Sequence, residues 1–208
     1  MKNDFIIGIP TLNRKDLLLP SLESYKKDFP NIEIHVIDNG KQNLKSDKNV
    51  IVHTEDENLG VAKSWNKICD IGFKSVNHVL LVNDDVFLGY GEKEVNRIIS
   101  SMQIGISQSM HLWSVVLIRK DIFDEIGRFD EQFYPAYLED SDYIYRLNLV
   151  GKRQGIDTRL NPKVVKHGGT WESKPEVVSQ YLNQNREKYV AKWGGLPFLE
   201  TFTNPYNQ

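Results

Sequence analysis

Strand-length apolar runs alternate with helical patterns through the first half of the chain, and this alternation restricts the fold more than any other feature. Each run is rich in β-branched residues and precedes a polar or glycine-containing turn, which predicts buried strands over residues 5–9, 33–37, 50–53 and 79–82. Helical spacing of apolar residues predicts helices over 16–27 and 61–74. We therefore expect an α/β fold with a mostly parallel central sheet and helices on both faces.

The turns that follow those strands are the expected location of functional side chains. Ligands of doubly wound sheets bind outside the carboxyl ends of the strands, where consecutive turns meet. The four turns have the sequences PTLNR (residues 10–14), DNG (38–40), ENLG (57–60) and NDD (83–85). All four should lie at one edge of the sheet.

The second half of the chain is less regular but predicts further elements. We expect helices over 94–102, 120–126 and 140–150, and a strand over 113–118. Ser173 and Glu176 form a capping box, with Pro175 in the first turn, for a last helix that ends near Lys192 before two glycines. A length of 208 residues favours one domain over 1–208, with two halves that meet at about residue 88.

Composition excludes several classes of protein. With 26 lysine and arginine against 28 aspartate and glutamate residues, the net charge of −2 argues against binding nucleic acid by bulk electrostatics. The single Cys69 cannot form an intrachain disulfide, and this cysteine usage favours a reducing, cytoplasmic location. The apolar runs fall far short of the roughly 20 residues that span a bilayer, so we expect no transmembrane segment. The first residues also lack the pattern of a signal peptide.

A buried strand that runs directly into two carboxylates is the sharpest chemical feature of the sequence. Asn83, Asp84 and Asp85 follow the apolar run at 79–82. Mg²⁺ and Mn²⁺ are held in proteins by one or two carboxylates together with substrate phosphates, which such a sparse acidic site would allow. The alternative is an ordinary turn in which these side chains cap backbone groups.

A second acidic segment follows an aromatic, proline-containing stretch and opens a predicted helix. Glu139, Asp140 and Asp142 lie there, and amides at a helix N-terminus would keep Asp140 ionised and available as a base. The alternative is structural: Asp140 would be an N-cap and Asp142 would pair with Arg146 one turn later.

His167 follows a short apolar run and precedes two glycines. An imidazole there could be a further metal ligand, although a lone histidine is more often structural. Aromatic residues near the polar clusters, such as Trp113, Tyr134, Tyr137 and Trp171, could stack on a sugar or a base.

Taken in order, these motifs resemble the GT-A glycosyltransferases, and within them the family-2-like enzymes that use nucleotide-diphosphate sugars. The resemblance extends from Phe5 to about Trp171 and rests on IGIPTLNR (residues 7–14), IDNG (37–40), NLG (58–60), the NDD turn, and GRFDE (127–131) with its following Glu139-Asp140 pair. It implies a GT-A fold, Rossmann-like, with a nucleotide-binding and an acceptor-binding half.

The resemblance also implies roles for individual residues. The nucleotide part of the donor would contact Pro10, Thr11, Arg14, Asp38, Asn58, Gly60, Lys63 and Asn66. Asp84 would orient the ribose or the donor sugar, Asp85 and His167 would hold Mn²⁺ or Mg²⁺, Asp140 would be the general base, and Glu139 would bind the substrate.

Two positions depart from the family pattern. Asn83 stands where an acid is common, which leaves Asp85 as the main metal ligand and weakens the case for metal dependence. Trp65 precedes Asn66 where relatives often have a basic residue near the diphosphate, so Lys63 or Arg14 would supply that charge.

The expected reaction is transfer of a hexose or deoxyhexose from a UDP-sugar to a hydroxyl of a glycan or glycoprotein acceptor, with inversion and with Asp140 as base. The alternatives are a sugar nucleotidyltransferase and a non-catalytic carbohydrate-binding module. The opening strand and loop also resemble the glycosyltransferase domain of large algal viruses that acts on capsid glycans, which implies a virus-encoded enzyme in the host cytoplasm.

Overall fold

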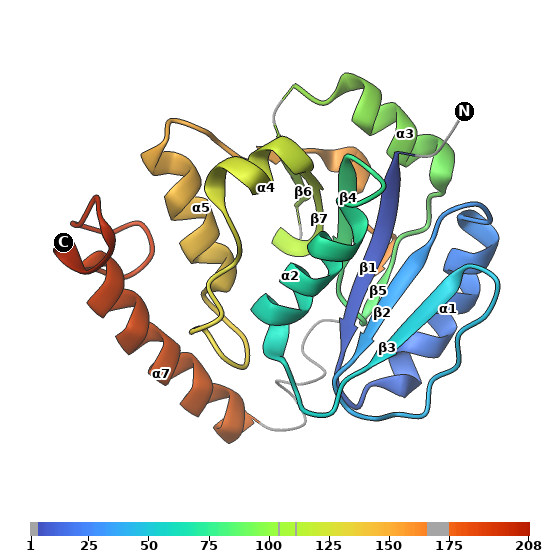
Figure 1. The fold of residues 1–208 in the computed structure, drawn as a ribbon, viewed down its shortest axis with the longest axis horizontal. Coiled ribbons are helices and arrows are strands. Elements are labelled where there is room, and N and C mark those ends of the chain that lie inside the picture. Colours follow the sequence, from blue (N-terminus) through green and yellow to red (C-terminus); the bar gives the residue numbers. More distant parts are fainter. Residues whose placement is uncertain (1–3, 104, 111, 166–174) are drawn as a thin grey trace.

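A computed structural model describes residues 4–103, 105–110, 112–165 and 175–208 of the chain. Its centre is a seven-stranded sheet in the order β3-β2-β1-β4-β7-β6-β8 (Figure 1). The strands are β1 (Phe5–Thr11), β2 (Ile34–Asp38), β3 (Val50–Thr54), β4 (His78–Val82), β6 (Ile106–Ser109), β7 (Leu112–Arg119) and β8 (Gly155–Ile156). A separate two-stranded ribbon pairs β5 (Val86–Phe87) with β9 (Val164–Val165).

The expected parallel arrangement is confirmed for the first half of the chain. β1 pairs in parallel with β2 and β4, and β2 pairs in parallel with β3. In the second half, β7 runs antiparallel to β4 and to β6, and β8 runs parallel to β6. The sheet is therefore mixed but mostly parallel, and it takes strands from both halves of the chain.

Helices cover both faces of the sheet, as expected (Figure 1). They are α1 (Lys15–Asp28), α2 (Gly60–Gly72), α3 (Glu92–Ser101), α4 (Lys120–Ile126), α5 (Glu139–Leu149) and α7 (Pro175–Trp193), with short 3₁₀ turns η1 (Thr158–Leu160) and η2 (Pro205–Asn207). Alternate residues of the fully buried β1 point to opposite faces. Ile7 packs into the core under α1 and α3, and Ile6 packs into the core under α2, α4 and α5.

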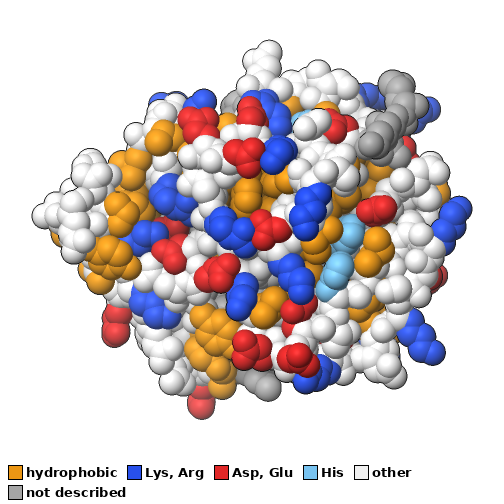
Figure 2. All heavy atoms as spheres, in the orientation of Figure 1, with side chains coloured by type: hydrophobic (Ala, Val, Ile, Leu, Met, Phe, Trp, Pro, Cys, Tyr) orange, Lys and Arg blue, Asp and Glu red, His pale blue; other side chains and the backbone are white. Residues whose placement is uncertain are grey.

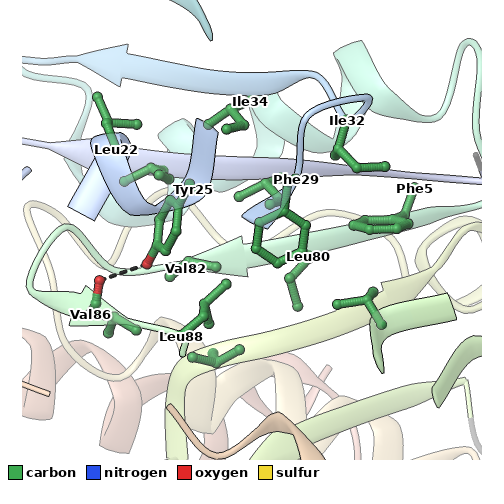
Figure 3. Packing of buried hydrophobic residues seen from close by; sticks show 14 of the residues in the cluster. Phe5, Leu22, Tyr25, Phe29, Ile32, Ile34, Leu80, Val82, Val86 and Leu88 are labelled. Carbon is green, nitrogen blue, oxygen red and sulfur yellow. Dashed lines mark hydrogen bonds between the residues drawn. The ribbon is translucent and has the colours of Figure 1, made fainter. Parts of the chain in front are cut away.

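The core under α1 is almost wholly apolar (Figure 3). Its one labelled polar contact is the Tyr25 hydroxyl, which donates to the carbonyl of Val86 at 2.6 Å. This bond ties α1 to the segment that follows the two carboxylates of the NDD turn. On the other face, Gly8 lets α2 approach β1, because a Cβ at that position would lie 2.1 Å from Cγ2 of Ile68.

The helices and the major strands of the first half match their predicted positions to within about two residues. The predicted helix ending near Lys192 is α7, which ends at Trp193, whereas Ser173 of its predicted capping box lies outside the described residues. The sequence pattern did not indicate β6, whose Ser107, Gln108 and Ser109 are polar although the strand is buried. Among the described residues, no helix combines the length and the apolar character needed to cross a membrane.

Candidate active site

The carboxyl edge of the parallel strands brings the first group of predicted residues together. Thr11, the last residue of β1, is in register with Asp38 at the end of β2. The Thr11 hydroxyl and the backbone N–H of Leu12 donate hydrogen bonds to Asp84, and the positive charge of Arg14 lies close enough to act on the same carboxylate. One cluster at this edge thus contains side chains from three of the four polar turns.

Asp84 is electrostatically unusual. Burial raises its pKa to about 6, and the neighbouring charge of Asp85 acts in the same direction. The hydrogen bond from Thr11 and the charge of Arg14 oppose this rise without cancelling it. A carboxylate that is partly desolvated next to a second carboxylate is stabilised by a bound cation, so the pair suits a hard divalent metal.

Of the two predicted metal ligands, Asp85 and His167, only Asp85 is among the described residues. Asp84 and Asp85 lie side by side in the turn between β4 and β5 and are both partly buried. His167, the other predicted ligand, lies outside the described residues, as does Trp171. Among the residues that are described, no group of three or more His, Cys, Asp or Glu side chains is arranged to hold a metal. The two aspartates fit an ion that completes its shell with substrate oxygens.

Asp38 is fully buried, and its carboxylate organises its own loop. It accepts hydrogen bonds from the backbone N–H groups of Gly40 and Gln42, at 3.0 and 2.8 Å, and from the Gln42 side chain at 3.0 Å. Pro10 is buried in β1 beside these residues. The loop after β2 is therefore held in one shape by a carboxylate at its base.

The start of α2 is fixed by two asparagines. The Asn58 side chain accepts from the N–H of Gly60 at 2.9 Å, and the Asn39 side chain accepts from the N–H of Leu59 at 3.0 Å. Asn39 also donates to the hydroxyl of Ser64 at 3.0 Å. These bonds satisfy amides that a helix N-terminus leaves without intrahelical partners.

Asn66 and Lys63 do not join the cluster at the carboxyl edge. Asn66 is fully buried, and its amide forms two bonds with the backbone of Phe129 and a third with the carboxylate of Glu131, each 2.9 Å long. These bonds make Asn66 a clamp between α2 and the segment before α5. Lys63 is exposed on the outer side of α2.

Lys63 lines a groove of about 290 Å³ between the start of α2 and the segment that leads to α5. The other lining residues are Glu57, Asn58, Leu59, Glu131 and Tyr134. Over the face of the molecule that Figure 2 shows, charged side chains of both signs are interspersed.

The predicted catalytic pair occupies the first turn of α5. The helix begins at Glu139 after Leu138, whose φ of 74° is left-handed, so Asp140 is inside the helix rather than its N-cap. Burial raises the pKa of Asp140, and hydrogen bonds from the N–H and hydroxyl of Ser141 only partly oppose that rise. Glu139 is 6% exposed, and burial followed by the charge of Asp140 raises its pKa well above the usual range. Oε2 of Glu139 has no hydrogen-bond partner among the described residues.

A buried ion network supports this turn from behind. Asp142 is fully buried and accepts hydrogen bonds from Arg146 at 2.9 Å, from Lys192 at 2.5 Å and from the Trp193 indole at 2.8 Å. Lys192 also bonds to Asp130 at 2.6 Å. The i+4 pair of Asp142 and Arg146 that the sequence suggested is present, within a larger network that joins α5 to α7.

The segment between these elements is held on both sides. Asn185 of α7 is fully buried and donates to the carbonyls of Ala136 and Tyr137, at 2.8 and 3.1 Å. The N–H of Val61 in α2 donates to the carbonyl of Pro135 at 2.8 Å. Gly60, with φ of 75°, makes room for this contact, because a Cβ there would lie 2.8 Å from the Pro135 carbonyl and 2.9 Å from Cδ2 of Tyr134. The segment that carries the predicted base therefore rests on the start of α2.

The sequence analysis did not identify Asn39, Gln42, Glu131, Asn185 and Lys192. Asn39 lies within the predicted turn at 38–40 and Gln42 lies two residues after it, so their polar side chains could have marked them as candidates. The partners of Asn185 and Lys192 are about 50 residues away in sequence, and no local pattern indicates contacts at that separation.

Comparison with known proteins agrees with this geometry. Residues 6–88 match the family model described as Glycosyl transferase family 2. The matched region covers the four polar turns and both aspartates of the NDD turn, and it ends before the segment that carries Glu139 and Asp140. No curated protein sequence matches the chain.

Solved structures share the fold over most of the chain. A mannosyltransferase, PcManGT, from Pyrobaculum calidifontis, in complex with GDP-Man and Mn²⁺, is similar with a TM-score of 0.63 at 12% identity, covering 90% of this chain and 64% of its own. TarS from S. aureus is similar with a TM-score of 0.56 at 15% identity, covering 76% of this chain and 36% of its own. The chain thus spans less than two thirds of either protein. Its fold is that of a GT-A, Rossmann-like domain, as the sequence predicted.

Proposed function

We propose that the protein is a glycosyltransferase that moves a sugar from a nucleotide-diphosphate donor to a hydroxyl of a glycan or glycoprotein. The observation that carries the proposal is the cluster of Thr11, Arg14, Asp84 and Asp85 at the carboxyl edge of β1 and β4, inside the segment that matches the family model. Ligands of open α/β sheets bind at this edge.

The predicted ligand Asp85 and its neighbour Asp84 would hold Mn²⁺ or Mg²⁺, and the metal would supply charge that stabilises the leaving diphosphate. For Asp84 this role replaces the predicted one of orienting the ribose or the donor sugar. Arg14, whose side chain is 21% exposed, would add a second positive charge beside the phosphates. Pro10, Thr11, Asp38 and Gly60 belong to the polar turns predicted at the ends of β1, β2 and β3, so we assign them to the nucleotide. Asn58 and Lys63 line a separate groove and Asn66 bonds to Phe129, so the nucleotide role of these three residues stays a prediction of the resemblance.

Asp140 is the proposed general base. Its pKa is raised by burial, and a carboxylate with a raised pKa attracts a proton more strongly at neutral pH than an ordinary aspartate. Transfer of the acceptor proton to Asp140 would allow the hydroxyl oxygen to attack the anomeric carbon as the bond to the diphosphate breaks, with inversion. Glu139 would bind the substrate, because burial raises its pKa well above the usual range and so favours the protonated carboxyl, which can donate a hydrogen bond.

The proposal also concerns the nucleotide that the donor sugar carries. We favour a UDP-hexose or UDP-deoxyhexose, as the resemblance implies. The similar mannosyltransferase was solved with GDP-Man, so the test must include guanosine donors.

The test is nucleotide release from a panel of UDP-, GDP- and dTDP-sugars, each with Mn²⁺ or with EDTA. We expect release from at least one donor, suppressed by EDTA and lost in Asp85→Ala. Asp140→Asn should retain donor binding in calorimetry but lower the rate by about a hundredfold to ten-thousandfold. Asp56→Ala, which changes a fully exposed aspartate in the loop after β3, is the matched control and should behave as wild type.

Each outcome separates the alternatives. Donor binding without turnover in the wild type, with mono- and oligosaccharide acceptors present, would favour a carbohydrate-binding module. Release of pyrophosphate from a nucleoside triphosphate and a sugar phosphate would favour a nucleotidyltransferase. Either result would contradict the proposal.

A further inference from the structure

The groove between α2 and the segment before α5 is distinct from the proposed reaction centre. None of Asp84, Asp85 and Asp140 lines it. Its walls come from both halves of the chain: Glu57, Asn58, Leu59 and Lys63 on one side, and Glu131 and Tyr134 on the other. The two sides cannot separate freely, because the bond from Val61 to Pro135 and the tight contact at Gly60 join them.

The polar groups of the groove are available to a ligand. Neither Lys63 nor Glu57 has an ion-pair or hydrogen-bond partner among the residues that the structure describes. The carboxylate of Glu131 is held in place by Asn66, whose amide donates to its Oε1 at 2.9 Å. A fixed carboxylate, an amine and an amide within one small groove offer both donors and acceptors of hydrogen bonds.

Tyr134 adds an apolar surface to this polar set. Its side chain is exposed to 46%, although the neighbouring Phe133 is completely buried. The backbone at Pro135 is bonded to α2, so the ring is presented from a fixed support rather than from a free loop. An exposed aromatic face flanked by hydrogen-bonding groups is complementary to a sugar ring, which has an apolar face of C–H groups and a rim of hydroxyls.

The charges of the groove favour a neutral ligand. Glu57 and Glu131 carry two negative charges, which are balanced by Lys63 in the groove and by Arg128, whose guanidinium lies 3.9 Å from the Glu131 carboxylate. An anionic saccharide or a phosphate would therefore meet no net attraction, whereas hydroxyl groups can pair with the lysine and with both carboxylates.

We propose that this groove binds a neutral sugar unit of the glycan acceptor, at a position remote from the hydroxyl that reacts. That the bound sugar belongs to an acceptor rests on the proposed function, but binding of a neutral saccharide can be tested without any donor. The segment from Tyr134 to Asp140 is continuous and is clamped by Asn185 at Ala136 and Tyr137. A sugar on Tyr134 would therefore be held at a fixed distance from the proposed base.

The experiment is a titration of ¹⁵N-labelled protein, without donor, with neutral saccharides: maltose, cellobiose, lactose, chitobiose, methyl α-mannoside and methyl α-rhamnoside. We expect at least one to shift the backbone amides of Leu59, Lys63 and Glu131. Tyr134→Ala should weaken that binding by about tenfold or more, and Tyr134→Phe, which keeps the ring, should retain it. Tyr206→Ala is the matched control, because Tyr206 is exposed to 48% and lies outside the groove.

The proposal is overturned if no saccharide shifts those amides, or if Tyr134→Ala binds as tightly as wild type while its spectrum remains that of the folded protein. Saccharide binding without donor cleavage by any variant would refute the proposed function and leave the groove in place. Donor cleavage without saccharide binding would do the reverse.

Discussion

Residues 5–88 (the donor half), which carry the proposed donor site, and the contact between α5 and α7 are held together by different forces. In residues 5–88, the strands β1, β2 and β4 are buried throughout, and their cores are built from aliphatic and aromatic side chains. Between α5 and α7, the apolar cluster is small, with Phe133, Tyr189 and Trp193 at its centre. There, the fully buried Asp142 and the side chains that bond to it join the two helices.

This difference has consequences for how each region tolerates change. Salt does not screen apolar packing as it screens charge pairs. The loss of a buried methyl group lowers the free energy of unfolding in proportion to the cavity that it leaves. Removing one partner from a buried charge network is strongly destabilising, because the remaining groups stay charged and desolvated. The position of the catalytic turn should therefore depend on a few polar side chains, whereas the donor loops rest on a sheet that many residues support.

The largest expected effect is in the network. Asp142→Asn keeps the shape of the side chain but leaves the buried Lys192 and the half-buried Arg146 with one negative partner fewer. We expect a loss of about 3–5 kcal/mol in the free energy of unfolding, measured by urea denaturation. Asp124→Asn, which breaks the exposed pair with Lys120, should change it by less than about 0.5 kcal/mol. Similar values for the two variants would contradict the contrast between the regions.

The corresponding change in the donor half is Leu80→Ala. Leu80 is completely buried in β4, and the cavity left by its side chain should lower the free energy of unfolding by about 2–5 kcal/mol. Because no charge is involved, the loss should be the same at low and high salt. Leu19→Ala, at a position exposed to 42%, is the control and should have little effect. A penalty for Leu80→Ala that shrank as salt was added would count against an apolar origin.

A smaller effect is expected where α7 grips the segment before α5. Asn185→Ala would remove the donor to two carbonyls, and we expect a cost of about 1–3 kcal/mol. Transfer to an acceptor should fall by more than donor hydrolysis does, because the donor half keeps its own support. Asn183→Ala, an exposed asparagine on the same helix, provides the comparison. Equal losses in both reactions would indicate a general effect on folding.

The smallest effect concerns Asp84 and has the opposite sign. Its pKa is raised to about 6 in the folded protein from an ordinary value of 3.8, so the folded state binds the proton more tightly than the unfolded state. The stability that this provides is fully present below pH 3.8 and is lost as the pH rises through 6. Asp84→Asn should therefore stabilise the metal-free protein at pH 7.5 by about 1 kcal/mol, with the gain vanishing near pH 4. Thermal unfolding at both pH values measures this, and equal shifts at the two would disprove the assignment.

The parts of the molecule that the sequence predicted are those determined by local patterns. The buried strands 5–9 and 79–82 are apolar runs that end at polar turns, and strand order along the chain then places Thr11 beside Asp84. The polar strand β6 was missed because its burial comes from neighbours on both sides of the sheet rather than from its own composition. The network around Asp142 was seen only as an i+4 pair, since Lys192 and Trp193 reach it from 50 residues away.

Local reasoning also assigned Asn66 by its place in a motif. The motif is present and lies at the start of α2 as expected, but helix geometry turns this side chain toward Phe129 and away from the strand ends. The resemblance to a viral glycosyltransferase domain, the roles of His167 and the division of the chain at residue 88 remain predictions.

The tight contact at Gly60 limits which second-site mutations could compensate for a side chain at this position. The glycine belongs by position to the donor half, yet the atoms that exclude a side chain there belong to Tyr134 and Pro135. Second-site changes that remove the Tyr134 ring should therefore relieve part of the damage of a Gly60→Ala allele, whereas the strain from the positive φ of Gly60 and the contact with the Pro135 backbone would remain. The residue allowed at position 60 therefore depends on a segment more than 70 positions away in the sequence.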